Sequence, residues 1–314
     1  MARRPRDVSW PPDPEPLPSP LVDDHTHLDA VVGGTGPGGW SGAPVTTPSA
    51  GGPEVRAHLA RAAAAGVTRL VQIGCDLDAV PWTLEALDAH PELLGGVAIH
   101  PNEAVLHAGV REVAPDGLDP DPQPRHAISL DDAMATVAAA ARHPRVRVVG
   151  ETGLDFFRAG DQGRAVQREA FRAHVALAKE LGLALQIHDR DAHDAVLEVL
   201  EADGAPERTV FHCFSGDAAM ARHCAEQGWY LSFAGPVTFA ANDGLRAALR
   251  ETPASQLLLE TDAPYLTPHP FRGRPNGPYL VAATARRVAE ELDLDLEELC
   301  RTVSRTAEQV YGPW

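Results

Sequence analysis

The chain has 314 residues and a formal net charge of −17, and 44% of its residues are hydrophobic. This length allows one large α/β barrel or two ordinary domains, and the hydrophobic fraction is enough for a sizeable core. The acidic balance argues against a protein that coats duplex nucleic acid through a basic face, although bound divalent cations would still allow a phosphate substrate.

The first 20 residues are rich in proline and charge, and they predict a flexible arm ahead of a single domain over residues 21–314. No apolar stretch follows the Arg3-Arg4 pair, and no run reaches the length of a membrane span. The four cysteines form no Cys-x-x-Cys pair and indicate reduced thiols. We therefore expect a cytoplasmic protein without a membrane anchor, and the sequence indicates no obligate protein partner.

Short apolar runs then alternate with Ala-rich helical segments. The predicted strands are residues 21–24, 69–73, 96–99, 146–150, 183–187, 209–211, 229–233 and 257–260. The predicted helices include residues 54–65, 131–142, 162–181, 193–202, 217–227 and 242–250. Eight strands alternating with helices predict an α/β fold of the TIM-type (β/α)8 barrel class. The competing doubly wound sheet is not supported by a Gly-x-Gly-x-x-Gly motif after the first strand. Residues 33–53 and 109–125, dense in Gly, Pro or Asp, are predicted to be long surface loops.

The motif Asp24-His25-Thr26-His27 ends the first predicted strand. Side chains two positions apart on a strand point to the same side, so His25 and His27 can converge on one cation. A single histidine would more often be structural. Two histidines at this spacing, at a strand end, favour metal ligands.

Four further candidate ligands lie at the ends of predicted strands: Glu151, His188, His212 and Asp262. Each residue alone has an ordinary structural explanation, such as a helix cap or a buried histidine. The carboxyl ends of barrel strands, however, are where such folds build their active sites. The set of imidazoles and carboxylates therefore predicts a metal site at one mouth of the barrel.

The chain resembles the TatD family of metal-dependent deoxyribonucleases, within the amidohydrolase-like barrels. The similar segments run in the expected order from about Leu21 to Tyr311. They are Asp24-His25-Thr26-His27-Leu28-Asp29, Ile99-His100-Pro101, Gly150-Glu151-Thr152-Gly153-Leu154-Asp155, Ile187-His188-Asp189-Arg190-Asp191-Ala192, Phe211-His212-Cys213-Phe214-Ser215-Gly216, Glu260-Thr261-Asp262-Ala263-Pro264-Tyr265-Leu266 and Pro268-His269-Pro270-Phe271-Arg272-Gly273-Arg274-Pro275-Asn276.

The resemblance implies two divalent metal ions and assigns their ligands. His25, His27, Glu151 and Asp262 would hold the first ion, and Glu151, His188 and His212 the second. Glu151 and Asp262 would be the catalytic carboxylates, with Asp262 as the general base. The histidine-rich set favours Zn, Mn, Fe or Ni, whereas the resemblance implies activity with Mg, so the identity of the metal (Mg, Mn or Zn) stays open.

The same resemblance suggests further roles. His100, Arg190 and Arg272 would contact substrate phosphates, and Asp155 and Glu260 would orient ligating histidines. Asn276 is expected to hold the loop after the last strand or a substrate group. The chain departs from the usual pattern at Asp189, at Gly277 and in the long loop of residues 33–53. These departures bear on substrate preference rather than on the metal ligands.

The leading functional hypothesis is a phosphodiesterase that trims DNA from single-stranded or frayed ends as a 3′–5′ exonuclease. The alternative is an amidohydrolase-like enzyme for a small amide, lactone or phosphoester. That alternative is weakened because Glu151 stands where a carboxylated lysine would bridge the metals. A third possibility is a scaffold without turnover, which the full ligand set disfavours.

Overall fold

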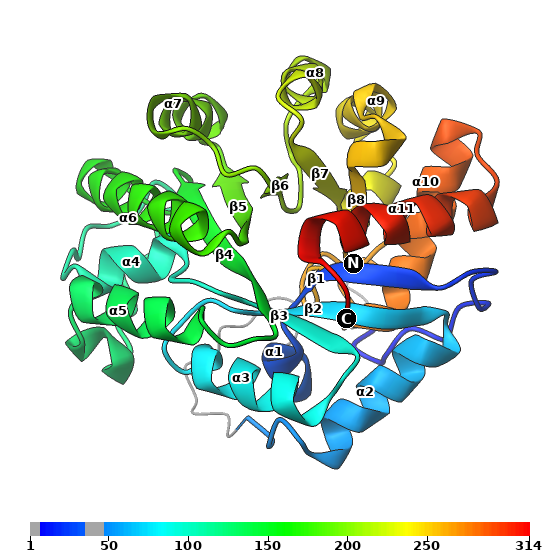
Figure 1. Ribbon diagram of the computed structural model, residues 1–314, viewed down its shortest axis with the longest axis horizontal. Coiled ribbons are helices and arrows are strands. Elements are labelled where there is room, and N and C mark those ends of the chain that lie inside the picture. Colours follow the sequence, from blue (N-terminus) through cyan, green and yellow to red (C-terminus); the bar gives the residue numbers. More distant parts are fainter. Residues whose placement is uncertain (1–6, 35–46) are drawn as a thin grey trace, which may run out of the picture.

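The computed structural model describes residues 7–34 and 47–314, and within them it shows one sheet of eight parallel strands. The strands follow one another around the sheet in chain order, which confirms the predicted (β/α)8 barrel (Figure 1). They are β1 (Leu21–Thr26), β2 (Val67–Gly74), β3 (Leu93–Val97), β4 (Val146–Asp155), β5 (Ala184–Arg190), β6 (Thr209–Phe211), β7 (Tyr230–Phe233) and β8 (Leu257–Leu259).

The helices form an outer layer around these strands (Figure 1). The α-helices are α1 (Leu28–Val32), α2 (Pro53–Ala64), α3 (Ala79–Ala89), α4 (Pro101–His107), α5 (Leu130–Ala140), α6 (Asp161–Leu181), α7 (His193–Asp203), α8 (Ala218–Glu226), α9 (Asp243–Glu251), α10 (Val281–Leu292) and α11 (Leu296–Tyr311). Short 3-10 helices are η1 (Pro124–Ala127), η2 (Gly235–Thr238), η3 (Ala254–Gln256) and η4 (Pro278–Leu280). Of the helices in the described ranges, none has the length and apolar character needed to cross a bilayer.

Of the three apolar clusters among the described residues, the two larger ones stabilise the barrel. The larger lies between strands and helices, where residues such as Phe171 and Val175 of α6 face the sheet. The smaller fills the barrel interior with residues such as Val22, Ile73 and Val148, and the end of α11 packs against it through Val310 and its neighbours. Because α11 closes the interior in this way, the last helix of the chain contributes to the barrel core itself.

The gap between β1 and β8 is bridged by the residues that follow them. Thr26 pairs with Ala263, the amide of Asp262 donates to the carbonyl oxygen of His25 at 3.0 Å, and the amide of His27 donates to the carbonyl oxygen of Ala263 at 2.8 Å. Closure of the barrel and placement of the first predicted histidine pair therefore depend on the same backbone contacts.

The strand ends at the mouth differ from the prediction. β4 continues through Glu151 to Asp155, and β5 continues through His188 to Arg190, because parallel pairing runs on from Thr152↔Ile187 to Asp155↔Arg190. Glu151 and His188 thus lie inside strands rather than after them.

Two segments outside the barrel are also described. The loop over residues 109–125 is pinned at the rim: Glu112 accepts from the Gly163 amide at the start of α6 at 2.6 Å, and Asp116 pairs with Arg158 at 3.2 Å. Of the predicted loop over residues 33–53, residues 35–46 lie outside the described residues. The predicted arm over residues 1–20 is described from residue 7 onward, and its flexibility stays a prediction. Hydrogen bonds and the buried Leu17 join residues 7–20 to the barrel.

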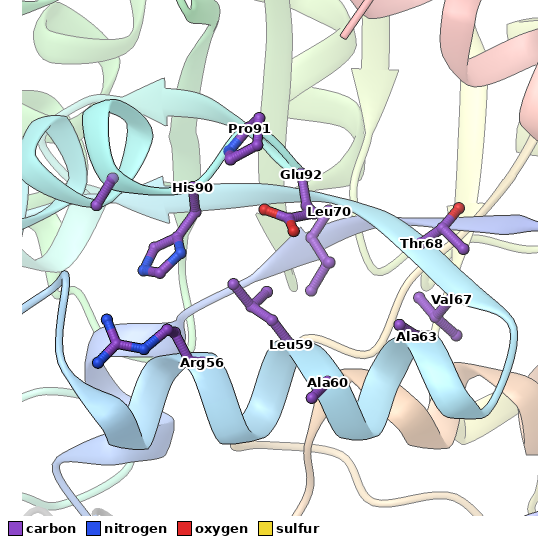
Figure 2. A pocket seen from close by; sticks show the side chains of 11 residues that line it. Arg56, Leu59, Ala60, Ala63, Val67, Thr68, Leu70, His90, Pro91 and Glu92 are labelled. Carbon is purple, nitrogen blue, oxygen red and sulfur yellow. The ribbon is translucent and has the colours of Figure 1, made fainter.

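A cleft of about 330 Å³ lies on the outer wall between α2 and the start of β2 and β3 (Figure 2). Leu59 of α2, Val67 and Thr68 of β2, and Glu92 before β3 are among its lining residues. The amino ends of strands form the face of a barrel opposite to its active-site mouth. This cleft is therefore separate from the predicted metal residues.

Candidate metal centre

The six predicted metal ligands meet at the carboxyl ends of the strands. They lie on β1, β4 and β5, directly after β1 and β6, and in the turn that follows β8: His25, His27, Glu151, His188, His212 and Asp262. All except the partly exposed His188 are buried. The donor atoms of His25, His27 and Glu151 lie within 4.8 Å of one another, as do those of His100, Glu151 and His188.

Glu151 lies between two pairs of histidines. Its Oε1 is 3.4 Å from His27 Nε2 and 3.9 Å from His25 Nε2. Its Oε2 is 2.7 Å from His212 Nε2 and 3.1 Å from His188 Nδ1. One carboxylate oxygen thus faces each pair, which is the arrangement required of a carboxylate shared by two cations.

The rings of the first pair are each held from behind by an acceptor. His25 Nδ1 lies 2.8 Å from Gln186 Oε1, and His27 Nδ1 lies 3.1 Å from the carbonyl oxygen of Ile73. An Nδ1–H donated to these oxygens leaves the lone pair of each neutral ring on Nε2. Both Nε2 atoms face Asp262 Oδ1, at 4.0 Å and 3.6 Å. A metal ion bound at Nε2 requires this tautomer, in which Nδ1 carries the proton.

The second pair is oriented by the two predicted partners. His212 Nδ1 lies 3.3 Å from Glu260 Oε1, and His188 Nε2 lies 3.4 Å from Asp155 Oδ2. A proton held toward each of these carboxylates leaves the other ring nitrogen facing Glu151. The two rings present opposite nitrogens to the centre, Nε2 of His212 and Nδ1 of His188.

A close approach of β4 to β5 makes this geometry possible. Gly153 has φ +141°, and a Cβ there would lie 2.1 Å from the carbonyl oxygen of His188. Only glycine fits such a contact. Glu151 and Asp155, two positions to either side, therefore flank the His188 ring.

Buried polar support for His25 was not predicted from the sequence. Gln186 Nε2 donates to the carbonyl oxygen of Asp24 and to Tyr311 Oη, both at 2.8 Å, which fixes its oxygen toward His25. The Tyr311 hydroxyl donates to Asp24 Oδ2 at 2.7 Å, and Ser232 Oγ donates to Asp24 Oδ1 at 2.6 Å. A glutamine inside an otherwise apolar strand was a signal that could have identified Gln186.

Asp262 lies on a constrained turn. Its φ is +51°, in the left-handed region that a non-glycine residue rarely adopts and that is common at functional sites. The preceding Thr261 donates from its amide and hydroxyl to buried Asp23, at 2.8 and 2.6 Å. Asn276 donates to the carbonyl oxygen of Thr261 at 3.0 Å, so it holds the loop after β8. Burial raises the pKa of Asp262 to about 7, although His212 and His27 oppose this shift.

The buried carboxylates make the mouth electronegative. Burial disfavours the charged form of His27. The hydrogen bond and the negative charge of Glu151 outweigh this effect and raise the pKa of His27 to about 9. Burial of His188 is likewise outweighed by Asp155 and Glu151, and its pKa is about 9. Such a site attracts divalent cations, whose binding would release these protons. The nitrogen and oxygen donors at this mouth therefore fit a divalent metal.

His100 faces the centre but differs from the other histidines. Its Nδ1 accepts from the Asn102 amide at 3.1 Å, so its proton is on Nε2, 3.9 Å from Glu151 Oε2. Burial lowers the pKa of His100 to about 4, which keeps the ring neutral. In this tautomer His100 presents a hydrogen-bond donor to the mouth.

The two predicted arginines lie around the centre rather than within it. Arg190 stacks over Phe157 at 4.0 Å, and Arg272 stacks over Phe239 at 4.7 Å. Within residues 7–34 and 47–314, no ion pair joins either guanidinium to the six predicted ligands.

A further His and Glu cluster lies on α4 and η1, but it is better explained as an ion-pair cluster. The Arg125 guanidinium binds both oxygens of Glu103, at 2.7 and 2.9 Å. His126 Nδ1 accepts from the Gln123 amide, so its Nε2 proton is donated to Glu103 at 2.8 Å. These contacts occupy the donor atoms of Glu103 and His126. Nε2 of His107, the third residue of the cluster, has no hydrogen-bond partner among the described residues.

Comparisons with known proteins identify the family to which this chain belongs. The family model described as TatD related DNase matches residues 22–312. The chain is 41% identical to the Mycobacterium tuberculosis protein named "Uncharacterized metal-dependent hydrolase TatD", over 93% of this chain and 98% of that protein. It is 33% identical to "Uncharacterized metal-dependent hydrolase YabD" of Bacillus subtilis, again over 93% and 98%.

Solved structures show the same fold. The Escherichia coli TatD homologue YJJV superposes with a TM-score of 0.74 at 23% identity, covering 94% of this chain and 98% of that one. A TatD family hydrolase from Entamoeba histolytica has the same TM-score at 16% identity, covering 95% and 100%.

Proposed function

Because this chain belongs to the TatD related DNase family and is a metal-dependent hydrolase, we propose that its reaction is phosphodiester hydrolysis in DNA. It would remove nucleotides in the 3′–5′ direction from single-stranded or frayed ends. The observation that supports this most directly is Glu151, whose two oxygens face two different histidine pairs. Paired cations suit the displacement of one phosphate oxygen by another.

In this proposal each Glu151 oxygen serves one cation. Oε1, His25, His27 and Asp262 would hold the first, and Oε2, His188 and His212 the second. The ions (Mg, Mn or Zn) would supply Lewis acidity toward the phosphate and the attacking water.

The protein's own groups then move protons and hold the substrate. Asp262 would accept the proton of the attacking water as the bond from phosphorus to the leaving 3′ oxygen breaks, and that oxygen would take up a proton from solvent. The turn of Asp262 keeps its carboxylate at the centre. His100 donates its Nε2 proton to a phosphate oxygen. Arg190 and Arg272 hold flanking phosphates, since a guanidinium fork suits phosphate oxygens. We propose a cytoplasmic location as well, consistent with four free cysteines.

The test is a time course with a 5′-labelled single-stranded oligonucleotide, purified protein and Mg or Mn. We expect stepwise shortening from the 3′ end by wild type, and a loss of roughly 10³-fold or more for Glu151→Ala. The exposed α7 variant Glu201→Gln is the matched control and should retain full activity. If wild type and Glu151→Ala were indistinguishable on DNA, the proposal would be wrong. Turnover of small lactones or esters instead of DNA would favour the amidohydrolase-like alternative.

A further inference from the structure

The N-terminal arm (residues 7–20) climbs the outer wall of the barrel from the base of β1 toward the mouth. At the base, Ser304 Oγ donates to the carbonyl oxygen of Pro20 at 2.8 Å, and the amide of Leu17 donates to Ala65 at 3.0 Å. Midway, Arg61 of α2 donates to the carbonyl oxygen of Pro11 at 2.7 Å and pairs with Asp13. The contacts run along the arm and leave its upper end beside the loop that follows β8.

That upper end meets the β8 loop (residues 263–277) through Arg274. Arg274 Nε donates to the carbonyl oxygen of Ser9 at 2.9 Å, and Nη2 donates to Ser9 Oγ at 3.0 Å and to the carbonyl oxygen of Trp10 at 2.7 Å. A further ion pair joins Arg274 to Asp7 at 3.4 Å. The Arg274 guanidinium therefore contacts three residues of the arm, Asp7, Ser9 and Trp10.

The Trp10 indole packs against Gly277 of the β8 loop, which has no side chain. A Cβ on Gly277 would lie 3.2 Å from Trp10 Cζ3, a tighter contact than side chains normally make. Next to it, the Tyr279 hydroxyl donates to the carbonyl oxygen of Pro11 at 2.9 Å. The departure from the family pattern at Gly277 is thus explained by the arm, since a polar side chain there would displace the indole ring.

The β8 loop carries groups that the proposed reaction needs. Thr267 Oγ1 donates to the carbonyl oxygen of Arg274 at 2.6 Å and so closes the loop on itself. Arg272, inside the closed segment, stacks over Phe239. Asn276 connects the end of the loop to the turn of Asp262.

We propose that the N-terminal arm positions the β8 loop, with Trp10 and Arg274 acting through Arg272 on the phosphate that flanks the scissile bond. This inference rests on the proposed nuclease function. A loop that is not held in place loses conformational entropy when it binds a ligand, so an unsupported loop should bind oligonucleotides less well. The metal centre, which is built by other strands as well, should keep its activity toward a small diester.

The test compares Trp10→Ala with Val8→Ala, a matched control on the same arm whose side chain is 72% exposed. For Trp10→Ala we expect KM for a single-stranded oligonucleotide to rise roughly tenfold with kcat little changed. Turnover of bis(4-nitrophenyl) phosphate, which has no flanking phosphate for Arg272 to bind, should be unaltered. In an Arg272→Ala background, Trp10→Ala should add less than about twofold, because both changes act through one group.

Amide hydrogen exchange over residues 266–277 provides a readout that does not depend on activity. Exchange should be faster in Trp10→Ala than in wild type and Val8→Ala. Unchanged exchange and unchanged KM in Trp10→Ala would overturn the inference, as would full additivity with Arg272→Ala. A wild-type protein inactive on DNA would instead contradict the proposed function, while the exchange data would still decide whether the arm holds the loop.

Discussion

Gln186 supports the centre from outside the predicted ligand set. It accepts from His25 Nδ1 and is itself held by Asp24 and Tyr311. Gln186→Leu removes the acceptor that keeps the His25 lone pair on Nε2. We expect metal affinity to fall by roughly 10–100-fold, the usual effect of losing such a partner. Competition against a fluorescent chelator measures this affinity.

The control for this prediction is Gln162→Leu, at an exposed position of α6, which should bind metal as wild type does. Tyr311→Phe provides a milder test, because it removes only the hydroxyl that steadies Gln186 and Asp24. A smaller loss in the same direction is expected. If both Gln186→Leu and Tyr311→Phe bound metal with wild-type affinity, the hydrogen bonds behind His25 would not contribute to metal binding, and the prediction would be wrong.

For single residues, the sequence predicted the polar side chains that converge at the mouth, but not Gln186 and Tyr311, which support them. His25 and His27 were predictable because strand periodicity places both on one side. Their partners were not, because Gln186 and Tyr311 are separated by 125 positions and meet only when α11 closes the barrel. Asp155 and Glu260 were suggested by family resemblance, and they lie beside His188 and His212.

Between elements, Glu103 joins α4 to η1. Its contacts with His126 and Arg125 outweigh burial and lower its pKa from 4.5 to about 2. A carboxyl group with a lowered folded-state pKa stabilises the protein fully above its unfolded value, and the stabilisation is lost as pH falls through the folded value. Glu103→Gln should therefore lower the free energy of unfolding by roughly 2–3 kcal/mol at pH 7.

Urea unfolding of wild type and Glu103→Gln at pH 7, 4 and 3 measures this effect. The difference between the two proteins should be largest at pH 7 and shrink progressively between about pH 4.5 and 2. Other carboxyl groups titrate in both proteins and cancel in the comparison. A difference that stayed constant down to pH 3 would contradict the lowered pKa of Glu103.

The alternation of elements was predictable, whereas several boundaries were not. The β6 range was predicted as observed, since its apolar run ends where pairing ends. β4 was predicted to stop at residue 150 because Glu151 and Asp155 are polar, yet backbone pairing with β5 continues beneath those side chains. Apolar periodicity indicates which residues are buried in an apolar core. It therefore does not predict the end of a strand whose last residues bury polar side chains at a functional site.

For the whole molecule, the barrel concentrates buried carboxylates at one mouth, where they repel one another. Divalent cations that bind only the folded state should therefore stabilise it, by about 2.7 kcal/mol at one hundred times the dissociation constant. We expect the melting temperature to fall when metal is removed with EDTA and to recover when Mn or Zn is restored. Differential scanning calorimetry measures both changes.

Glu151→Ala separates this effect from general salt effects. Without the shared carboxylate, added cation should leave the melting temperature nearly unchanged, whereas Glu201→Gln should respond as wild type does. An equal response in Glu151→Ala and wild type would place the stabilising cation elsewhere.

The hydrogen bonds that join Tyr311 to Asp24 and Gln186 also bear on the order in which the site can form during synthesis. During synthesis on the ribosome, all six proposed ligands emerge before the residue that completes the support of His25. A nascent chain stopped after Asp262 has every ligand but lacks both the helix that fills the barrel interior and the hydroxyl that orders its first histidine. Metal loading in the cell is therefore expected to follow the synthesis of α11 rather than the emergence of the six ligands.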